Sequence, residues 1–229
     1  SPERLDGLPI VIGSATDPYQ PAERRFRLTR SMLEVFGEHR GLHLAIITKS
    51  ALIARDAALL AELATRHRVS VHISLAALDA GLLRQLEPRT PTPKVRLDAL
   101  RALASAGVPV GLLIAPILPG LTDDTLTLQT LLAAAREAGA RWAGGGPLRI
   151  GPATRHTLFP WLLKHRPILA RRYREHYGDR RGVTKAYADA LNQRLAALMD
   201  QLGYDPREGM RREEELRTPR GTGQLGLFE

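Results

Sequence analysis

The sequence predicts an α/β protein, an open and partial (β/α) barrel of about five parallel strands followed by a C-terminal helical region. Short apolar runs rich in β-branched residues alternate with longer runs of helical periodicity. This alternation is typical of parallel strands joined by crossover helices. Five strands are too few to close an eight-stranded barrel, and they leave room for one further βα unit in front. Beyond about residue 150 the pattern is helical only.

The predicted strands are short, and each ends in polar or conformationally special residues. Four apolar runs predict strands at 8–13, 43–48, 69–74 and 108–114, and three glycines weaken a fifth strand at 141–148.

The expected helices fill the intervals between these strands. We expect them at 22–36, at 56–66, after a cap at Asp79, at 94–106, and from a cap at Thr122 or Asp123 to about Gly139.

Composition divides the chain into three segments. We expect the partial barrel at 1–150, a helical extension at 151–205 and a charged, flexible tail at 206–229. Pro160 and Pro167 interrupt the extension before a long helix near 184–202. Within the tail, residues 218–223 have the composition of a flexible linker.

The bulk composition favours a cytoplasmic protein with one sizeable core. The chain has 229 residues, of which 44% are hydrophobic. No apolar run approaches the ~20 residues that a membrane helix needs, and the first residues do not form a signal peptide. We therefore expect no membrane partner. The sequence has no cysteine, so it offers neither a disulfide nor a thiolate metal ligand.

The charge is strongly positive and unevenly distributed. The formal net charge is +9 and the sequence pI is about 10.5, which favours polyanionic partners and nucleic acid first. Arginines concentrate between residues 166 and 181, and we take Arg171, Arg172 and Arg174 as candidate contacts to nucleic acid. The alternative is a merely solvated face in a protein that uses arginine wherever a cation is needed.

Polar residues follow the predicted strands at the edge where ligands bind in parallel α/β sheets. They occupy residues 13–21 after the first strand, residues 48–50 after the second, Ser74 after the third and residues 115–120 after the fourth. Such a set suits a ligand with a carboxylate, an amine and sugar hydroxyls, without identifying it.

Four of these segments together resemble one known family. GSATDPYQP at 13–21 with Glu23, ITKS at 47–50, VSVHIS at 69–74 with LEPRTP at 86–91, and IAPILPGLTD at 114–123 occur in order and at matching spacing. They are similar to successive strand ends of the spore-photolyase-like group of radical S-adenosylmethionine (SAM) proteins. The resemblance covers residues from about 9 to 148.

The resemblance implies a six-stranded partial barrel and a radical chemistry. In the family, a [4Fe-4S] cluster held by a CxxxCxxC loop cleaves SAM, and the deoxyadenosyl radical abstracts hydrogen from a substrate. The matching cofactor-binding positions are Ser14, Thr16, Asp17, Lys49, Ser74, Ala115 and Pro116. The resemblance implies that Ser14 lies near the methionyl group, that Lys49 binds the ribose and that Ser74 binds the carboxylate. The backbone around Ala115 and Pro116 would flank the adenine, and Thr16 and Asp17 have no assigned contact.

The sequence departs from the family in one respect. The cluster loop belongs after a strand upstream of the first one here, and no cysteine replaces it. We expect a truncated sequence rather than a degenerate homologue, so this chain alone would be inactive and the cluster would occur only in the complete protein. The catalytic residues and the substrate stay undefined, although the family includes a thymine-dimer repair enzyme.

Two other functions remain open. One is a conventional lyase or aldolase-like barrel enzyme, but Lys49 has no apolar cage visible in the sequence to favour Schiff-base chemistry. The other is a non-catalytic, basic protein that binds DNA or the bacterial sliding clamp.

Several remaining residues have structural interpretations. We expect Glu87 and Arg89 to form an ion pair at a helix end, and His72, inside a strand, to be packed or hydrogen-bonded. Of the seven histidines only His39 and His43 are four residues apart, and they lie outside the predicted helices, so we predict no second metal.

The residues Gln224, Leu225, Gly226, Leu227 and Phe228 resemble the QLxLF peptide with which bacterial repair and replication proteins dock onto the sliding clamp. Leu225, Leu227 and Phe228 would be apolar anchors and Gln224 an amide contact. Gly226 departs from the commoner Ser or Asp. The alternatives are that this apolar segment folds back onto its own barrel or is merely disordered.

Overall fold

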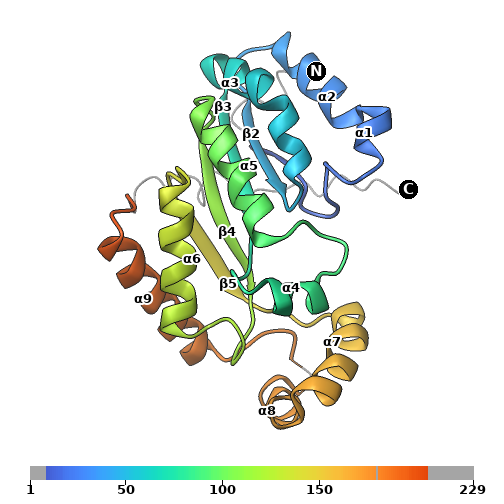
Figure 1. The fold of residues 1–229 in the computed structure, drawn as a ribbon, viewed down its shortest axis with the longest axis vertical. Coiled ribbons are helices and arrows are strands. Elements are labelled where there is room, and N and C mark those ends of the chain that lie inside the picture. The colour runs from blue at the N-terminus through green and yellow to red at the C-terminus, as the bar shows by residue number, and fades with distance from the viewer. Residues whose placement is uncertain (1–8, 179, 206–229) are drawn as a thin grey trace, which may run out of the picture.

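A computed structural model describes residues 9–178 and 180–205 of the chain. Its centre is one parallel sheet in the order β1-β2-β3-β4-β5, which confirms the predicted partial barrel (Figure 1). The strands are β1 (Pro9–Ile12), β2 (His43–Thr48), β3 (Arg68–Ser74), β4 (Val110–Ile117) and β5 (Ala143–Pro147). Each strand pairs with the next along the chain, so all carboxyl ends lie at one edge.

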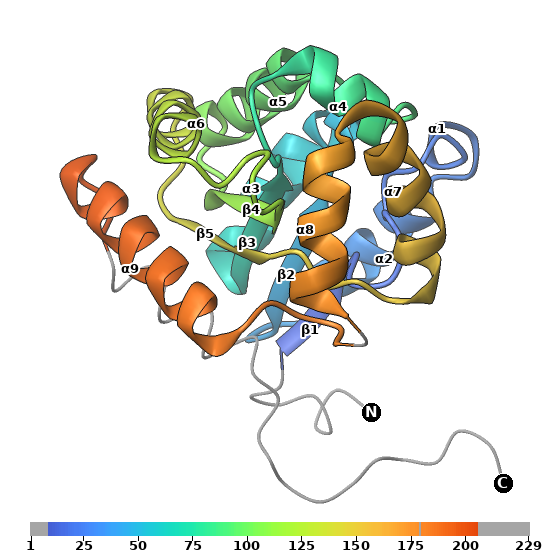
Figure 2. The ribbon, with the colours of Figure 1, turned by 90° about the horizontal axis from the view of Figure 1, so that it is seen from below.

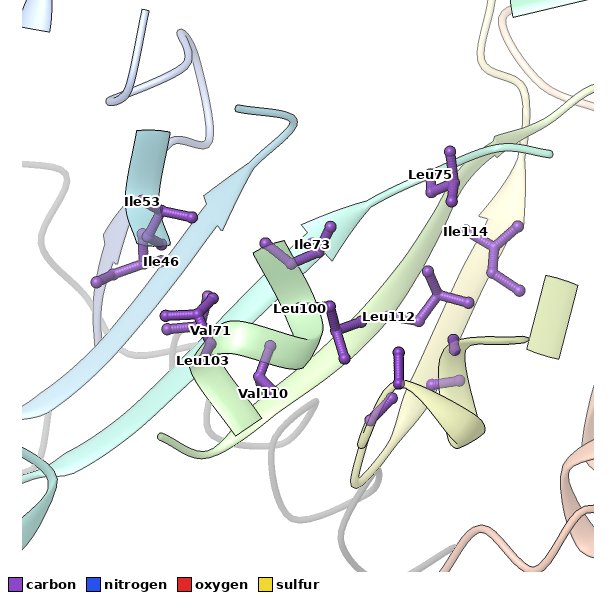
Figure 3. Close-up of a cluster of buried hydrophobic side chains, with 14 of the residues drawn as sticks. Ile46, Ile53, Val71, Ile73, Leu75, Leu100, Leu103, Val110, Leu112 and Ile114 are labelled. Carbon is purple, nitrogen blue, oxygen red and sulfur yellow. The ribbon is translucent and has the colours of Figure 1, made fainter. Parts of the chain in front are cut away.

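Helices cover one face of the sheet because alternate strand residues are apolar and point toward them. These helices are α2 (Leu28–Gly37), α3 (Ala57–Arg66), α5 (Pro93–Ser105) and α6 (Thr125–Glu137). In the main core, Val71 and Ile73 of β3 lie with Leu100 and Leu103 of α5, as Figure 3 shows. The intervening residues of β3 therefore face the opposite side of the sheet.

On that opposite side, His72 and Trp142 form a packed pair. The Trp142 indole Nε1 donates a hydrogen bond of 3.3 Å to His72 Nδ1, and the rings meet edge to face. Gly111 makes room for the indole, since a Cβ there would lie 2.2 Å from Trp142 Nε1. The prediction of a packed, hydrogen-bonded His72 is confirmed.

The helical region after residue 150 divides between two cores. Helices α7 (Pro152–His165) and α8 (Pro167–Tyr177) pack together around their own apolar cluster, which includes Leu148 and Leu162. Helix α9 (Lys185–Gln201) packs against α6 and β5 and adds Leu191, Leu195 and Leu198 to the main core. In both views α7 and α8 lie beyond the carboxyl ends of the strands (Figures 1 and 2).

The helix predicted at 22–36 is in fact two helices, α1 (Glu23–Phe26) and α2. The break is at Arg27, whose φ of 51° is left-handed. The Glu23 carboxylate accepts hydrogen bonds from the backbone N–H groups of Thr29 (3.0 Å) and Arg30 (3.2 Å). Because these groups begin α2, the carboxylate of one helix caps the next.

Of the two predicted helix N-caps, one is confirmed and one is wrong. Asp79 caps α4 (Ala80–Leu86) as predicted, because its Oδ1 accepts from the Leu82 N–H. The prediction that Thr122 or Asp123 caps α6 is wrong, since Asp124 Oδ1 accepts from the Thr127 N–H.

Thr122 and Asp123 are occupied inside the preceding loop. Thr122 Oγ1 accepts from the Leu118 N–H, and Asp123 Oδ1 accepts from the Gly120 N–H. Among the helices of residues 9–178 and 180–205, none is long and apolar enough to cross a membrane.

Candidate functional site

The carboxyl edge of the sheet brings together the predicted cofactor residues of four strands. At β4 this edge is irregular, because Ile114 pairs with Gly145 and Ile117 with Pro147. Two residues of β4, Ala115 and Pro116, therefore oppose one residue of β5, which is a β-bulge. Proline cannot donate to the ladder, so the bulge interrupts pairing where the sequence predicted an adenine contact.

Asp17 fastens the loop after β1 onto the end of β2. Its Oδ1 accepts hydrogen bonds from Thr48 Oγ1 (2.6 Å) and the Tyr19 N–H (2.9 Å), and its Oδ2 accepts from the Lys49 N–H (2.9 Å). Both oxygens are thus engaged within the protein. Asp17 therefore holds the loop after β1 in place against the end of β2.

Ser14 and Thr16 differ from Asp17 in being exposed. Neither hydroxyl forms a hydrogen bond with another described residue, so both are available to a ligand. Gly13 brings this loop close to β2, because its φ is 98° and a Cβ would lie 2.1 Å from the Ile47 carbonyl oxygen. The close approach therefore requires glycine.

An ion-pair network with buried carboxylates connects the helices that follow this loop. Asp56 ends the short 3₁₀ helix η2 (Ala51–Asp56), and its fully buried carboxylate pairs with Arg30 (2.8 Å) and Arg55 (3.0 Å). Arg55 also reaches the Glu23 carboxylate at 3.2 Å. Burial opposes ionisation of Asp56, but the hydrogen bonds from Arg55 and Arg30 outweigh it and lower the pKa of Asp56 below its usual value. The network fixes α1 and α2 to η2.

Lys49, at the end of β2, pairs with Glu87, which follows α4. The other oxygen of Glu87 pairs with the buried guanidinium of Arg96 at 2.7 Å. The predicted pair of Glu87 with Arg89 is therefore wrong, because Glu87 turns inward to two cations of the barrel instead. Burial raises the pKa of Glu87, but hydrogen bonds from Lys49 and Arg96 outweigh burial, so the pKa lies below its usual value.

Ser74, at the end of β3, is buried and ties β3 to the β4 bulge. Its Oγ donates to the Ala115 carbonyl oxygen at 3.2 Å. The hydroxyl proton is therefore directed at the protein, and a ligand there would meet the remaining lone pairs or displace this bond.

A cavity of about 430 Å³ adjoins this edge. It is lined mainly by apolar side chains of α4, α7 and the segments after β4 and β5, and Glu87 and Pro116 border it. Trp161 also lines it, and its buried Nε1 has no hydrogen-bond partner among the described residues. An apolar cavity with a free indole N–H suits a flat ligand that carries an acceptor.

The predicted basic surface lies on α8. Arg171, Arg172 and Arg174 are all exposed, and Arg171 pairs with Glu175 at 2.9 Å. Within residues 9–178 and 180–205, Arg172 and Arg174 form no ion pair. The helix lies beyond the carboxyl ends of the strands, the same end as the site (Figure 2).

Sequence reasoning missed Arg96, although a signal was present. Arg96 lies at the same helical face as Ala99, Leu100 and Leu103, which are buried in the core. An arginine at i in an otherwise apolar i, i+3, i+4, i+7 pattern points into the protein and needs an acidic partner there.

Ligands for an iron–sulfur cluster do not occur in this sequence. It contains no cysteine. The described residues contain no group of three or more histidine and acidic side chains that could hold a metal ion. The predicted clamp-binding residues, Gln224, Leu225, Leu227 and Phe228, lie outside the described residues.

The family model of the radical SAM superfamily matches residues 4–132. An uncharacterised protein of Mycobacterium tuberculosis is 38% identical over 192 residues, which are 83% of this chain and 56% of that protein. An uncharacterised protein of Methanocaldococcus jannaschii is 32% identical over 114 residues, covering 50% of this chain and 42% of that protein. The chain thus spans about half the length of these relatives.

Solved structures of spore photoproduct lyase share the fold. A complex with dinucleoside spore photoproduct superimposes with a TM-score of 0.61 at 19% identity, over 87% of this chain and 59% of that chain. A variant with bound AdoMet and the same dinucleoside gives a TM-score of 0.63 at 19% identity, over 89% and 61% of the two chains.

Proposed function

This chain belongs to the radical SAM superfamily, and we propose that the complete protein is an enzyme that binds SAM along the carboxyl edge of the sheet. The observation that carries the proposal is the convergence at that edge of Lys49, Ser74 and the Ala115–Pro116 bulge beside a cavity of about 430 Å³. When bound, SAM supplies the hydrogen-abstracting radical chemistry of the superfamily. The cluster that this chemistry needs would be held by residues outside this sequence.

The described residues suit the parts of SAM as follows. Exposed Ser14 and Thr16 would bind the methionyl end, since their hydroxyls can donate and accept. The Lys49 ammonium uses one of its three donors on Glu87, and the others can reach a ribose diol. Pro116 borders the cavity, which would take the adenine ring. Asp17 would act by holding the loop, because both of its oxygens are already engaged.

The test uses the complete protein under anaerobic, non-reducing conditions. We expect Lys49→Ala and Ser74→Ala each to weaken SAM binding by about 1–3 kcal/mol, the usual cost of losing a buried polar partner. Lys94→Ala is the control, because Lys94 is an exposed lysine paired with Asp98 on α5. Unchanged affinity in both site variants would show that SAM binds elsewhere. After reconstitution with iron and sulfide, and with dithionite added as the electron donor, the wild type should reductively cleave SAM to methionine and, after hydrogen abstraction, 5′-deoxyadenosine.

We propose further that the substrate is a nucleic acid. The net charge of +9 and the exposed α8 arginines at the site end of the barrel support it. Spore photoproduct lyase, which shares the fold, is described in complex with a dinucleoside.

Charge reversal on α8 tests the nucleic-acid proposal. Binding to duplex DNA should weaken steeply with salt, and Arg171, Arg172 and Arg174 changed to Glu should lower both affinity and salt slope. The control is a triple reversal of other exposed arginines, those at 24, 25 and 40, which should change the slope less. Equal effects of the two triple variants would show that α8 contributes only through the net charge of the protein and is not a specific contact surface. DNA binding without any SAM binding would favour a non-catalytic DNA-binding protein.

We also propose that residues 224–228 dock onto the bacterial sliding clamp. A short peptide free in solution loses conformational entropy on binding, so the expected Kd is on the order of micromolar, about −8 kcal/mol. The measurement is titration of a peptide covering residues 220–229 against the clamp, with Leu227→Ala plus Phe228→Ala as control. No binding at high micromolar concentration removes the clamp as a partner, and equal binding of both peptides makes the contact non-specific.

The Lys49 environment argues against an aldolase-like mechanism. Schiff-base chemistry requires an amine free to attack a carbonyl carbon, whereas Lys49 Nζ is held in an ion pair with the Glu87 carboxylate. Borohydride in the presence of small aldehydes or ketones should therefore trap no adduct on Lys49. A trapped adduct on Lys49 would favour the aldolase-like enzyme over the SAM-binding enzyme.

A further inference from the structure

The residue that organises the carboxyl edge is a buried arginine on a crossover helix. Arg96 lies in the first half of α5, and its side chain is 0% exposed. A guanidinium in the interior is stable only when its donors are satisfied, because desolvation of the charge is otherwise prohibitive. The contacts of Arg96 therefore show which segments the fold holds together there.

Arg96 makes hydrogen bonds through all three of its nitrogens. Nε donates to the Pro91 carbonyl (2.9 Å), and Nη1 donates to the Ser74 carbonyl (2.9 Å). Nη2 donates to Glu87 Oε2 (2.7 Å) and to Thr90 Oγ1. These acceptors come from the end of β3 and from the segment between α4 and α5. One planar fork thus fixes the crossover against the strand end.

Two of these contacts lead directly to predicted SAM ligands. Through Glu87, Arg96 sets the position of the Lys49 ammonium, because the carboxylate bridges the two cations. Through the Ser74 carbonyl, Arg96 holds the residue whose hydroxyl bonds to Ala115. A displacement of the guanidinium would therefore disturb three of the four strand ends that the site uses.

The ion pairs also set the charge at this edge. Lys49 and Arg96 contribute two positive charges and Glu87 one negative charge, so the three residues together carry a net +1. Lys49 is the most exposed of the three, with a side-chain exposure of 32% against 15% for Glu87. The surplus positive charge therefore faces the ligand side through Lys49.

We infer that Arg96 is a positioning residue of the SAM site, which acts through Glu87 to aim Lys49 at the ribose. The inference rests on the proposed function, because it assumes that Lys49 binds the ribose of SAM. It adds to that proposal a residue on α5 that contacts no part of the ligand. A purely structural Arg96 would stabilise the crossover without affecting how the protein discriminates the ribose hydroxyls.

The experiment measures ribose discrimination rather than activity. Calorimetry with the complete protein under non-reducing, anaerobic conditions gives the Kd of SAM and that of its 2′,3′-dideoxyribose analogue. The ratio of the two Kd values is independent of the fraction of folded protein. For the wild type and for Arg101→Met, a control on the exposed face of α5, we expect the analogue to bind about tenfold more weakly.

Arg96→Lys should reduce this ratio to below about threefold, because a lysine keeps the charge but cannot hold Glu87, Ser74 and Pro91 at once. Glu87→Gln should reduce it similarly while leaving Arg96 in place, which keeps the inference testable should the Arg96 variant fail to fold. Lys49→Ala should bring the ratio close to one.

The outcomes distinguish the proposed contact of Lys49 with the ribose from the positioning role of Arg96. No SAM binding by the wild type, or a ratio that Lys49→Ala leaves unchanged, would contradict the proposed ribose contact itself. A ratio that falls in Lys49→Ala but stays tenfold in Arg96→Lys, or in Glu87→Gln should Arg96→Lys not fold, would overturn the positioning role. A parallel fall in all three variants would support it.

Discussion

Replacing Asp17 by asparagine should destabilise the chain itself, in the absence of any cofactor. The carboxylate accepts hydrogen bonds from Thr48, Lys49 and Tyr19, two on one oxygen and one on the other. Asparagine retains a single acceptor oxygen. Its amide group must then face either the Lys49 N–H or the other two donors. At least one hydrogen bond is lost and two donors oppose each other.

The magnitude follows from the kind of bond that is lost. Hydrogen bonds to charged acceptors contribute about 1.5–3 kcal/mol, so we expect Asp17→Asn to lower the free energy of unfolding by about 2–3 kcal/mol. For a chain of this length that corresponds to a fall in Tm of roughly 4–12 °C. Urea unfolding monitored by circular dichroism measures the effect as a shift in midpoint at constant m-value.

The control is the same chemical change at a helix cap. Asp124 caps α6 through one backbone N–H, and asparagine caps about as well as aspartate. Asp124→Asn should therefore change stability by less than about 0.5 kcal/mol. If Asp17→Asn is equally mild, the three hydrogen bonds do not hold the loop, and the assignment of Asp17 as its organiser fails.

Two further predictions concern packing and pH. Gly111→Ala should cost about 1–3 kcal/mol, because its Cβ would meet the Trp142 indole at 2.2 Å, whereas Gly146→Ala, with no atom within 4 Å, should be nearly neutral in the same urea assay. Burial lowers the pKa of His67, which accepts a hydrogen bond from the Leu42 N–H and is neutral in the fold. Its stabilisation should therefore be complete above the unfolded-state pKa of about 6.5 and decline as the pH falls below it, and His67→Gln should remove this dependence between pH 8 and 5.5. A urea midpoint equally pH-dependent in that variant would mean that another group titrates.

The sequence predicted the sheet well because buried parallel strands are short apolar runs that few other elements produce. The predicted 43–48 coincides with β2, whereas the predicted 108–114 stops short of β4, which ends at Ile117. The difference arises at Pro116, where a proline normally argues against a strand but here sits in a bulge. Similarly, helical periodicity runs through Arg27 without interruption, and the break depends on a cap supplied from Glu23.

The sequence predicted which residues lie at the candidate site, but not which residues they contact there. Asp17, Lys49 and Ser74 each lie at or just after the end of a strand, and parallel topology therefore brings them to one edge. The sequence could not show that Glu87 turns toward Lys49 and away from Arg89, because that choice depends on where α5 delivers Arg96. The partner arises from tertiary packing, which local spacing does not encode.

The polar residues at this edge therefore divide by what their donors and acceptors already do. Asp17 engages both carboxylate oxygens and Ser74 its hydroxyl proton on neighbouring strand ends, and Glu87 pairs with two cations. Ser14 and Thr16 are exposed without such bonds. Preorganised sites need both kinds, because a ligand group is held only as firmly as the residue that contacts it. Function at this edge should accordingly be lost by two separable routes. Changes at the exposed hydroxyls should weaken binding at unaltered stability, whereas a change at Asp17 should lower both together.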